Sequence, residues 1–141
     1  MNLYADSSAV LSWIFGEAKG QAVREVLAAA DSVLASDLTL VECDRTILRA
    51  HAAGRISESQ AADLRGHLVA TAAHWHLLRL DAEVIERARR PFSVEPIRTL
   101  DALHLASALA ARSALPDLVL LSMDERMRAV GRGLGFTLRP T

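Results

Sequence analysis

Short apolar segments alternate with longer helical patterns along this chain, and no other feature of the sequence restricts the fold as strongly. The first apolar segment, Asn2–Ala5, is followed by three residues of types that often begin helices, Asp6, Ser7 and Ser8. Further strands are predicted over residues 32–35, 76–80, 118–122 and 136–138. Because strands that alternate with helices form parallel sheets covered on both faces, the sequence predicts an α/β sandwich.

Residues with known capping preferences mark where the predicted helices begin and end. The helix predicted over 38–53 stops at Gly54, and Ser57 with Gln60 forms a capping box that opens the next helix. Pro91 ends a short helix that precedes it. Other helices are predicted over residues 9–15, 17–30 and 99–112, and from residue 124 to the glycines at 131–135.

The composition is typical of one globular domain with an aliphatic core. The 141 residues match the usual size of a domain, and 51% hydrophobic but only 4% aromatic residues indicate a core of Leu, Val, Ile and Ala. We therefore expect a single domain over residues 1–141. The net charge of −1 provides no general attraction for nucleic acid, so any phosphate-binding surface has to be local.

The chain is expected to be cytoplasmic. Cys43 is its only cysteine, which excludes an internal disulfide and is typical of a reducing compartment. Asp6 interrupts the first apolar stretch, so no secretory leader is predicted. The apolar stretch over residues 102–111 is too short to cross a bilayer, and no membrane association is expected.

Two aspartates are predicted at the same edge of the sheet. Asp6 follows the first predicted strand, and Asp124 follows the fourth. Ligands of open α/β sheets bind at the carboxyl ends of the strands, so both side chains are candidates for a functional site. Each also has a simpler interpretation, because an aspartate at such a position caps the helix that follows.

Two further carboxylates lie on predicted helices. Asp101 falls on the same side as Leu105 and Ala108 in a helix with little polar surface, where a bare carboxylate is costly unless a cation or hydrogen bonds compensate. A first-turn aspartate favoured by the helix dipole is the alternative. Glu42 points away from the apolar stripe of its own helix, and pairing with Arg45 on a solvated face would also explain it.

Four carboxylates in one place would suit a hard divalent cation. Such cations prefer oxygen ligands, and Mg²⁺ is usually held by a few carboxylates while water and substrate phosphate complete its coordination. A bound metal lowers the pKa of water so that the water can attack phosphorus. A site of this kind needs no nucleophilic side chain.

Four segments resemble the ordered motifs of the PIN-domain family: N-L-Y-A-D-S-S-A-V-L at 2–11, V-E-C-D-R at 41–45, T-L-D-A-L-H-L-A-S-A-L at 99–109 and L-L-S-M-D-E-R-M at 120–127. Their order and spacing, over almost the whole chain, resemble the toxin of VapBC-type toxin–antitoxin pairs. The resemblance implies a PIN-like three-layer α/β/α sandwich with a central parallel sheet.

The resemblance also implies a site, a reaction and partners. The acidic quartet of the family matches Asp6, Glu42, Asp101 and Asp124. Of these, the implied ligands of Mg²⁺ or Mn²⁺ are Asp6, Asp101 and Asp124, with Ser7 and Ser122 as supporting polar residues. The implied reaction is endonucleolytic hydrolysis of RNA phosphodiester bonds with water as the nucleophile. The implied partner is a VapB-like antitoxin that covers the active-site groove.

Basic and apolar side chains indicate further contacts. Arg45, Arg49 and Arg126 are candidates for binding RNA phosphates, although ordinary surface charge also explains each of them. His104 lies one helical turn after Asp101, and a packing role is favoured for it. The run over 9–15 has more apolar residues than one buried helix face needs, so we expect part of it to cover a homodimer or antitoxin surface.

Two other functions are compatible with the same residues. Asp6 could be the nucleophile of a phosphatase, although Ser8 stands where such enzymes usually have a second aspartate. A catalytically silent PIN-like module would bind RNA or protein and use its carboxylates only as caps. Metal binding and RNA cleavage distinguish these interpretations, whereas no motif specifies the RNA target.

Overall fold

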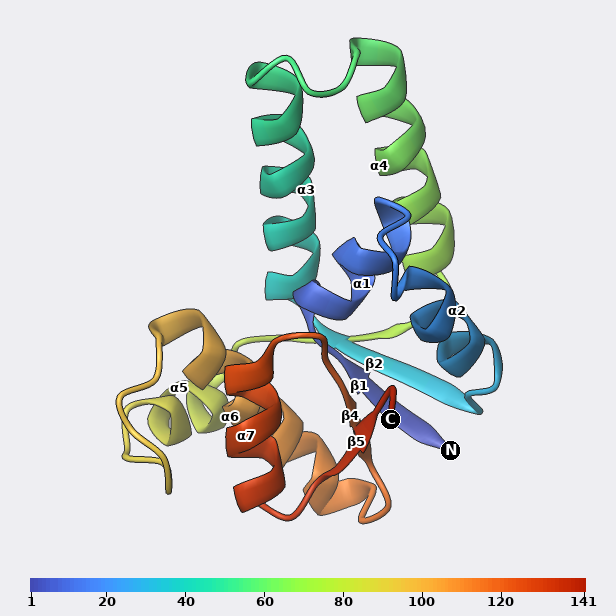
Figure 1. The fold of residues 1–141 in the computed structure, drawn as a ribbon. Helices are drawn as coiled ribbons and strands as arrows, with labels where there is room; N and C mark the ends of the chain where they lie inside the picture. Colours follow the sequence, from blue (N-terminus) through green and yellow to red (C-terminus); the bar gives the residue numbers. More distant parts are fainter.

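A computed structural model describes residues 1–141, which form a central sheet between two layers of helices (Figure 1). The five strands are all parallel and lie in the order β3-β2-β1-β4-β5. They are β1 (Asn2–Ala5), β2 (Ser32–Ser36), β3 (His76–Leu78), β4 (Val119–Leu121) and β5 (Thr137–Arg139). The predicted α/β sandwich with a central parallel sheet is confirmed.

Seven helices connect the strands, and three of them begin at capping residues predicted from the sequence, Asp6, Ser57 and Asp124. The seven helices are α1 (Ser7–Ile14), α2 (Gly20–Ala28), α3 (Asp37–Ala52), α4 (Glu58–Ala72), α5 (Ala82–Ala88), α6 (Thr99–Ala114) and α7 (Glu125–Gly133). Ser57 and Gln60 form the expected capping box at the start of α4. Gly54, just after α3, has a φ of +72°, a conformation that favours glycine. None of the helices combines the length and the apolar character needed to span a membrane.

α2 and β3 are shorter than predicted, for reasons of tertiary packing. α2 begins at Gly20 and not at residue 17, because the chain turns at Gly16, which has a φ of +65°, before the helix starts. Gly20 packs so closely on α1 that an added Cβ would lie 2.5 Å from the carbonyl oxygen of Ser12. β3 ends at Leu78 because it is an edge strand whose only partner, β2, ends there too.

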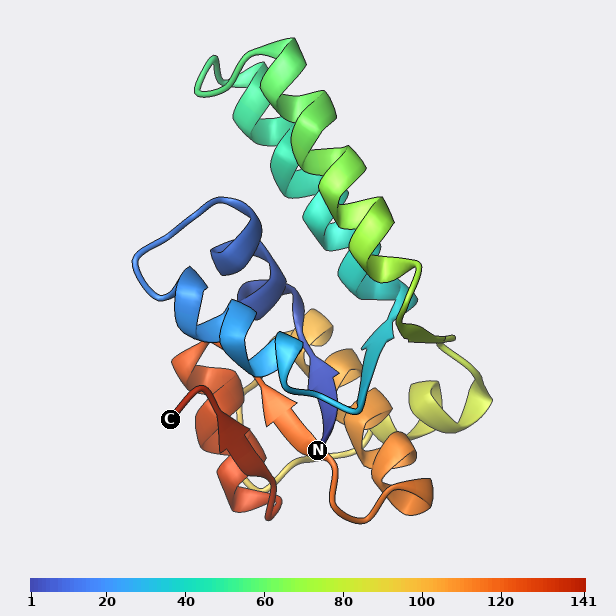
Figure 2. The same ribbon diagram turned by 90° about the vertical axis from the view of Figure 1, so that its right-hand side faces the viewer.

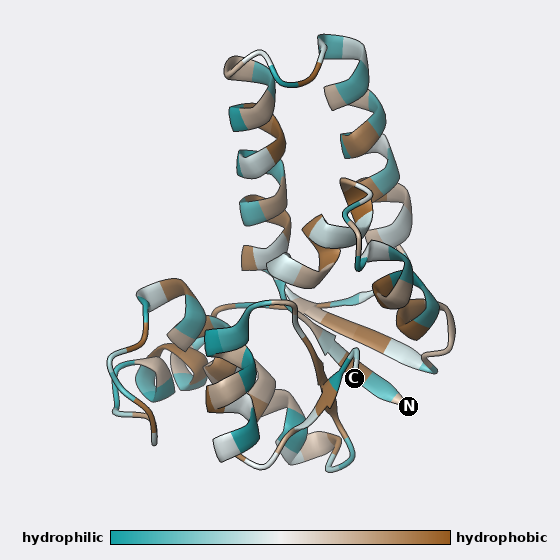
Figure 3. Cartoon of the chain, viewed as in Figure 1, coloured by the Kyte–Doolittle hydropathy of each residue, from teal (hydrophilic) through white to brown (hydrophobic).

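The two faces of the sheet pack against different helices, because side chains alternate along each strand. Leu3 and Ala5 belong to a core shared with α1, α2, α3 and α4, whereas Tyr4 belongs to a core shared with α6. All three side chains are fully buried, and the middle of the neighbouring strand β2 is brown in Figure 3. Cys43 is free and buried in the first of these cores.

The α3–α4 hairpin extends away from the sheet, and α1 packs against its base (Figures 1 and 2). Val10 and Ile14 of α1 are buried, and Trp13 packs edge-on against His67 of α4 with ring centroids 4.8 Å apart. Part of the apolar surplus of α1 is therefore covered within the chain, whereas Leu11, Trp13 and Phe15 stay partly exposed, and a partner surface there remains a prediction. The sequence pattern could not show that a hairpin from elsewhere in the chain covers this helix.

Candidate active site

Asp6 and Asp124 lie near the carboxyl ends of two neighbouring strands, as predicted. Asp6 directly follows β1, and its backbone N–H donates to the carbonyl oxygen of Leu121 at the end of β4 at 3.1 Å. Both aspartates also cap helices, since Asp6 accepts from the Ala9 N–H at 3.0 Å and Asp124 accepts from the Arg126 N–H at 2.8 Å. Capping and a role in a site therefore do not exclude each other here.

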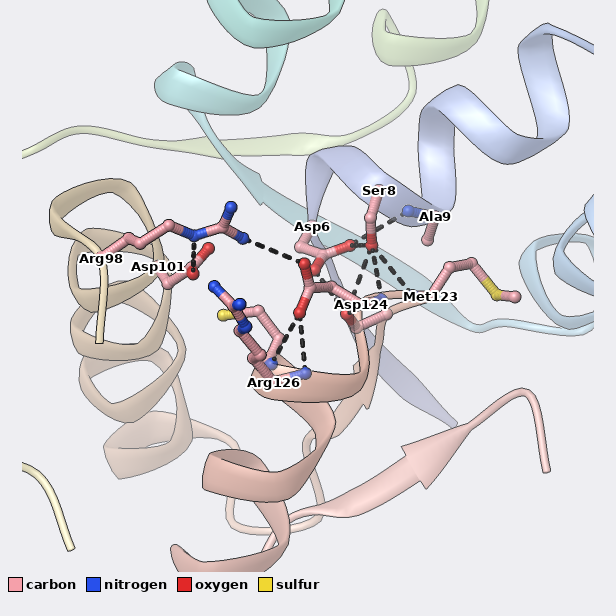
Figure 4. Close-up of polar contacts among 10 residues, drawn as sticks. Asp6, Ser8, Ala9, Arg98, Asp101, Met123, Asp124 and Arg126 are labelled. Carbon is pink, nitrogen blue, oxygen red and sulfur yellow. Dashed lines mark hydrogen bonds and ion pairs between the residues drawn. The ribbon is translucent and has the colours of Figure 1, made fainter. Parts of the chain in front are cut away.

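Two serines hold the Asp6 carboxylate between β1 and β4. Ser122 donates to Asp6 Oδ2 at 2.5 Å, and Ser8 donates to Asp6 Oδ1 at 2.7 Å. Ser8 Oγ also accepts the backbone N–H of Met123 at 2.9 Å and that of Asp124 at 3.2 Å (Figure 4). The Ser8 hydroxyl thus connects the segments that follow the two strands and fixes Asp6 relative to Asp124.

The hydrogen bonds expected of Ser7 are made by Ser8, which corrects the prediction from the sequence. Ser7 is the first residue of α1, and its side chain makes no hydrogen bond in the structure. Ser8 follows the capping Asp6 by two positions, so the first turn of the helix brings its hydroxyl back over the carboxylate. Ser122, the other predicted supporting residue, does contact Asp6.

Burial makes the Asp6 carboxylate costly to ionise in the folded protein. Only 2% of the residue is exposed, and this burial raises the pKa of its carboxyl group, while hydrogen bonds from Ser122, Ser8 and Ala9 lower it. A cation bound beside Asp6 would reduce the cost by stabilising the charged form. Oδ1 accepts hydrogen bonds from Ser8 and Ala9, whereas Oδ2 accepts only that from Ser122, so Oδ2 keeps a lone pair for a cation.

Asp101 and Asp124 are joined by the guanidinium group of Arg98 (Figure 4). Arg98 Nε lies 3.0 Å from Asp101 Oδ2, and a terminal nitrogen of the same group lies 3.1 Å from Asp124 Oδ2. The two carboxylates are 16% and 28% exposed, whereas the Arg98 side chain is 61% exposed. The hydrogen bond to Asp101, the charge of Asp101 and then that of Asp124 raise the pKa of Arg98, which keeps this group cationic.

Glu42 is held by a buried histidine, and the alternative pairing with Arg45 is absent. His104, which is 2% exposed, places Nε2 2.5 Å from Glu42 Oε1 and Nδ1 2.9 Å from the Tyr4 hydroxyl. Burial raises the pKa of Tyr4, so its hydroxyl stays protonated in its hydrogen bond with Nδ1. A carboxylate only accepts hydrogen bonds, so Nε2 is the donor to Glu42. The packing role expected of His104 is thus combined with a polar one.

The donor chemistry of these side chains fits a hard divalent cation. All four carboxylates offer oxygen, the ligand type that Mg²⁺ and Mn²⁺ prefer, and Asp101 and Asp124 already share one cationic group. In the present arrangement, however, no three acidic or histidine side chains surround a common point at which a metal could bind. The guanidinium group of Arg98 lies between two of the four carboxylates.

The three arginines predicted to contact RNA lie on exposed surfaces of α3 and α7. Arg45 makes no ion pair, and Arg49 donates to the Thr46 hydroxyl at 3.1 Å. Arg126 lines a cavity of about 230 Å³ together with Arg98 and Asp101. Of the three, only Arg126 shares a cavity with a carboxylate of the site.

Three residues that the structure places in the site were not predicted as its members: Arg98, Tyr4 and Ser8. Arg98 was detectable, because it precedes Asp101 by three residues, the spacing of a helical ion pair. Ser8 was detectable in the same way, since it shares the first helical turn with Asp6. Tyr4 carried no signal, because its partner His104 lies 100 positions away in the sequence.

Comparisons with known proteins identify the family of the chain. The family model described as PIN domain matches residues 3–133. The chain is 31% identical over 136 residues to ribonuclease VapC46 of Mycobacterium tuberculosis (strain ATCC 25618 / H37Rv), and this alignment covers 96% of the chain and 95% of the relative.

Two solved structures share the fold at low sequence identity. One is Mycobacterium tuberculosis VapC20, a toxin that cleaves the sarcin-ricin loop, with a TM-score of 0.64, 16% identity and coverage of 92% of this chain and 95% of that one. The other is VapBC2 from Rickettsia felis bound to a DNA fragment from its promoter, with a TM-score of 0.64, 11% identity and coverage of 99% and 98%. With a family match over residues 3–133 and 31% identity along nearly the full length of a relative, this chain belongs to the PIN-domain family.

Proposed function

We propose that the chain is a metal-dependent endoribonuclease and the toxin of a toxin–antitoxin pair, formed by one PIN domain over residues 1–141. The observation that carries the proposal is that Ser8 links Asp6 to the Asp124 backbone and Arg98 links Asp124 to Asp101, next to the carboxyl ends of β1 and β4. Similarity to a protein named as a ribonuclease supports the activity. A fold shared with a toxin that cleaves the sarcin-ricin loop supports RNA as the substrate class.

In this proposal Asp6, Asp101 and Asp124 would hold Mg²⁺ or Mn²⁺. The metal, when bound, supplies positive charge at the scissile phosphate and lowers the pKa of the attacking water. Ser8 and Ser122 keep both oxygens of the Asp6 carboxylate oriented. Because His104 binds only Oε1 of Glu42, the second oxygen of Glu42 stays available to accept a hydrogen bond from water.

We also propose a VapB-like antitoxin as partner and a homodimeric toxin. The fold is shared with a VapBC protein from Rickettsia felis, which supports the antitoxin. Large apolar side chains are exposed on the α3–α4 hairpin and near α5 and α6, and they support protein contacts: Val41, Leu48, Val69, Ile85, Val94 and Leu100. Light scattering of the partner-free chain tests the homodimer, for which twice the mass of one chain is expected.

Cleavage of RNA by the partner-free protein tests the activity. Structured and single-stranded RNAs are incubated with the native protein, Asp6→Asn and Asp101→Asn, in Mn²⁺ or in EDTA. Asp117→Asn is the matched control, because Asp117 is exposed and precedes β4, at the opposite end of the strand from the site. We expect cleavage that needs Mn²⁺, falls at least about 100-fold in both site variants and persists in the control.

The ends of the RNA fragments separate this reaction from that of a contaminating nuclease. Attack by water leaves linear phosphate ends, whereas a ribonuclease that uses the ribose 2′-hydroxyl group leaves a 2′,3′-cyclic phosphate. Equal cleavage by the native protein and the site variants would contradict the assignment of Asp6 and Asp101. If the native protein binds RNA in Mn²⁺ but never cuts it, a catalytically silent binding module replaces the proposed nuclease.

A further inference from the structure

Arg98 lies between two carboxylates that the proposed function assigns to a divalent cation. Its guanidinium group reaches Asp101 at 3.0 Å and Asp124 at 3.1 Å through two different nitrogens (Figure 4). The two carboxylates come from separate elements, since Asp101 lies in the first turn of α6 and Asp124 caps α7. A single positive group from the chain itself therefore neutralises part of the acidic site.

We propose that Arg98 is a displaceable occupant of the metal site, which binds Asp101 and Asp124 in the metal-free protein and transfers to a phosphate of the RNA once the metal is bound. This inference rests on the proposed function, because it requires Asp101 and Asp124 to bind the metal. Arg98 thus binds the two carboxylates before the metal is bound and an RNA phosphate afterwards.

The surroundings of Arg98 permit such an exchange. Its side chain is 61% exposed, and its contacts with Asp101 and Asp124 are its only side-chain hydrogen bonds. Although Arg98 occupies the capping position of α6, its side chain does not cap the helix. The residue also borders the cavity of about 230 Å³ that it shares with Arg126. Release of the guanidinium group therefore breaks no other side-chain hydrogen bond.

Charge explains why a divalent cation would displace the arginine. Two carboxylates and one guanidinium group leave a net negative charge, and the buried Asp6 carboxyl lies next to them through Ser8 and Asp124. A divalent cation compensates more of this charge and coordinates the oxygens directly, whereas partly exposed ion pairs contribute little. The freed guanidinium group can bind a phosphate through two parallel hydrogen bonds, the geometry for which arginine is suited.

Calorimetric titration of Mn²⁺ into the native protein, Arg98→Gln and Arg126→Gln tests the displacement. Arg126 is the matched control, because it is an exposed arginine that lines the same cavity but makes no ion pair with the carboxylates. We expect Arg98→Gln to bind Mn²⁺ about five- to thirtyfold more tightly than the native protein, and Arg126→Gln to differ by less than about threefold.

Initial cleavage rates at saturating Mn²⁺ test the transfer to RNA. We expect Arg98→Gln to raise KM by about tenfold with little change in kcat, because a phosphate contact is lost while the metal site is intact. Tighter metal binding together with a higher KM supports the proposal, since a merely structural role would not move the two affinities in opposite directions.

Failure of the proposal can be distinguished from failure of the proposed function. If Arg98→Gln binds Mn²⁺ no more tightly than the native protein, or if KM is unchanged, the role of Arg98 is refuted while the metal site stands. If none of the three proteins binds Mn²⁺, both proposals are refuted.

Nuclear magnetic resonance of the native protein tests the displacement without depending on the folding of a variant. The Nε–H signal of Arg98 is expected to shift when Mg²⁺ is added, because its hydrogen bond to Asp101 is broken. A signal that stays in place at saturating Mg²⁺ overturns the displacement.

Discussion

Replacement of Tyr4 by phenylalanine removes one hydroxyl group from the chain of hydrogen bonds that ends at Glu42. In the native protein this hydroxyl lies 2.9 Å from His104 Nδ1, and His104 Nε2 in turn lies 2.5 Å from Glu42. Tyr4 is 0% and His104 is 2% exposed, so water cannot replace the lost hydrogen-bond partner. A buried polar atom left without a partner costs about 1–3 kcal/mol, whereas the phenylalanine ring keeps the apolar contacts.

The expected loss in the free energy of unfolding is therefore about 1–2 kcal/mol, which corresponds to a fall in Tm of about 3–8 °C for a domain of this size. Urea unfolding in EDTA measures this loss without a contribution from bound metal. RNA cleavage is expected to slow by about two- to tenfold, since the His104 ring loses the hydrogen bond that orients it toward Glu42.

A double-mutant cycle with His104→Leu tests whether Tyr4 acts through the histidine. In that background the hydrogen-bond partner of the hydroxyl is gone, so Tyr4→Phe is expected to cost less than about 0.5 kcal/mol. An equal loss of stability in both backgrounds would refute the hydrogen-bond chain as the reason for the effect.

Three further substitutions test other contacts. Ser8→Ala removes a donor to Asp6 and the acceptor of two backbone N–H groups, so urea unfolding should show a loss of about 1–3 kcal/mol in the free energy of unfolding. Ser7→Ala breaks no hydrogen bond and should lose less than about 0.5 kcal/mol. Equal losses in the two variants would contradict the assignment of these hydrogen bonds to Ser8. Burial raises the pKa of Asp6, so above the ordinary carboxyl pKa the metal-free native state retains a proton that the unfolded chain has lost, and its stability falls as pH rises through that window. The stability of Asp6→Asn relative to the native protein should therefore increase from about pH 4 upwards, by at most about 1.4 kcal/mol per pH unit, and a difference independent of pH would refute the raised pKa. Gly20→Ala places a Cβ 2.5 Å from a backbone carbonyl oxygen and should destabilise the protein by about 1–3 kcal/mol. Gly66→Ala, in open space on α4, should stabilise it by about 0.5–1 kcal/mol. If thermal unfolding gives a higher Tm for both variants, the close approach of α1 and α2 is contradicted.

Most of the fold was predictable because it depends on interactions between residues that are close in sequence. Capping by Asp6, Ser57 and Asp124 involves only the next three residues, and the apolar alternation is likewise a local property. The start of α2 was not predictable, because it depends on the contact of Gly20 with another helix. The covering of α1 by the α3–α4 hairpin is equally a property of the assembled chain.

The site was predictable only where topology follows from the sequence pattern. Asp6 and Asp124 could be assigned to one edge of the sheet, because parallel strands share their carboxyl ends. The expectation for Asp101 depended on the apolar face of its helix, and that for Glu42 mainly on the resemblance to PIN domains. The sequence predicts Ser7 and not Ser8 as the residue that supports Asp6, because the pattern indicates a helix start but not which hydroxyl faces the carboxylate.

The sequence by itself thus determined the types of chemical group, the order of the elements and the edge at which two carboxylates meet. Only the tertiary structure decided what compensates the charge of each carboxylate. Ser122 lies 116 positions from Asp6, His104 lies 62 positions from Glu42, and Arg98 lies 26 positions from Asp124. The physical reason is that hydrogen bonding and electrostatic interaction depend on separation in space and on burial, and a local sequence pattern specifies neither.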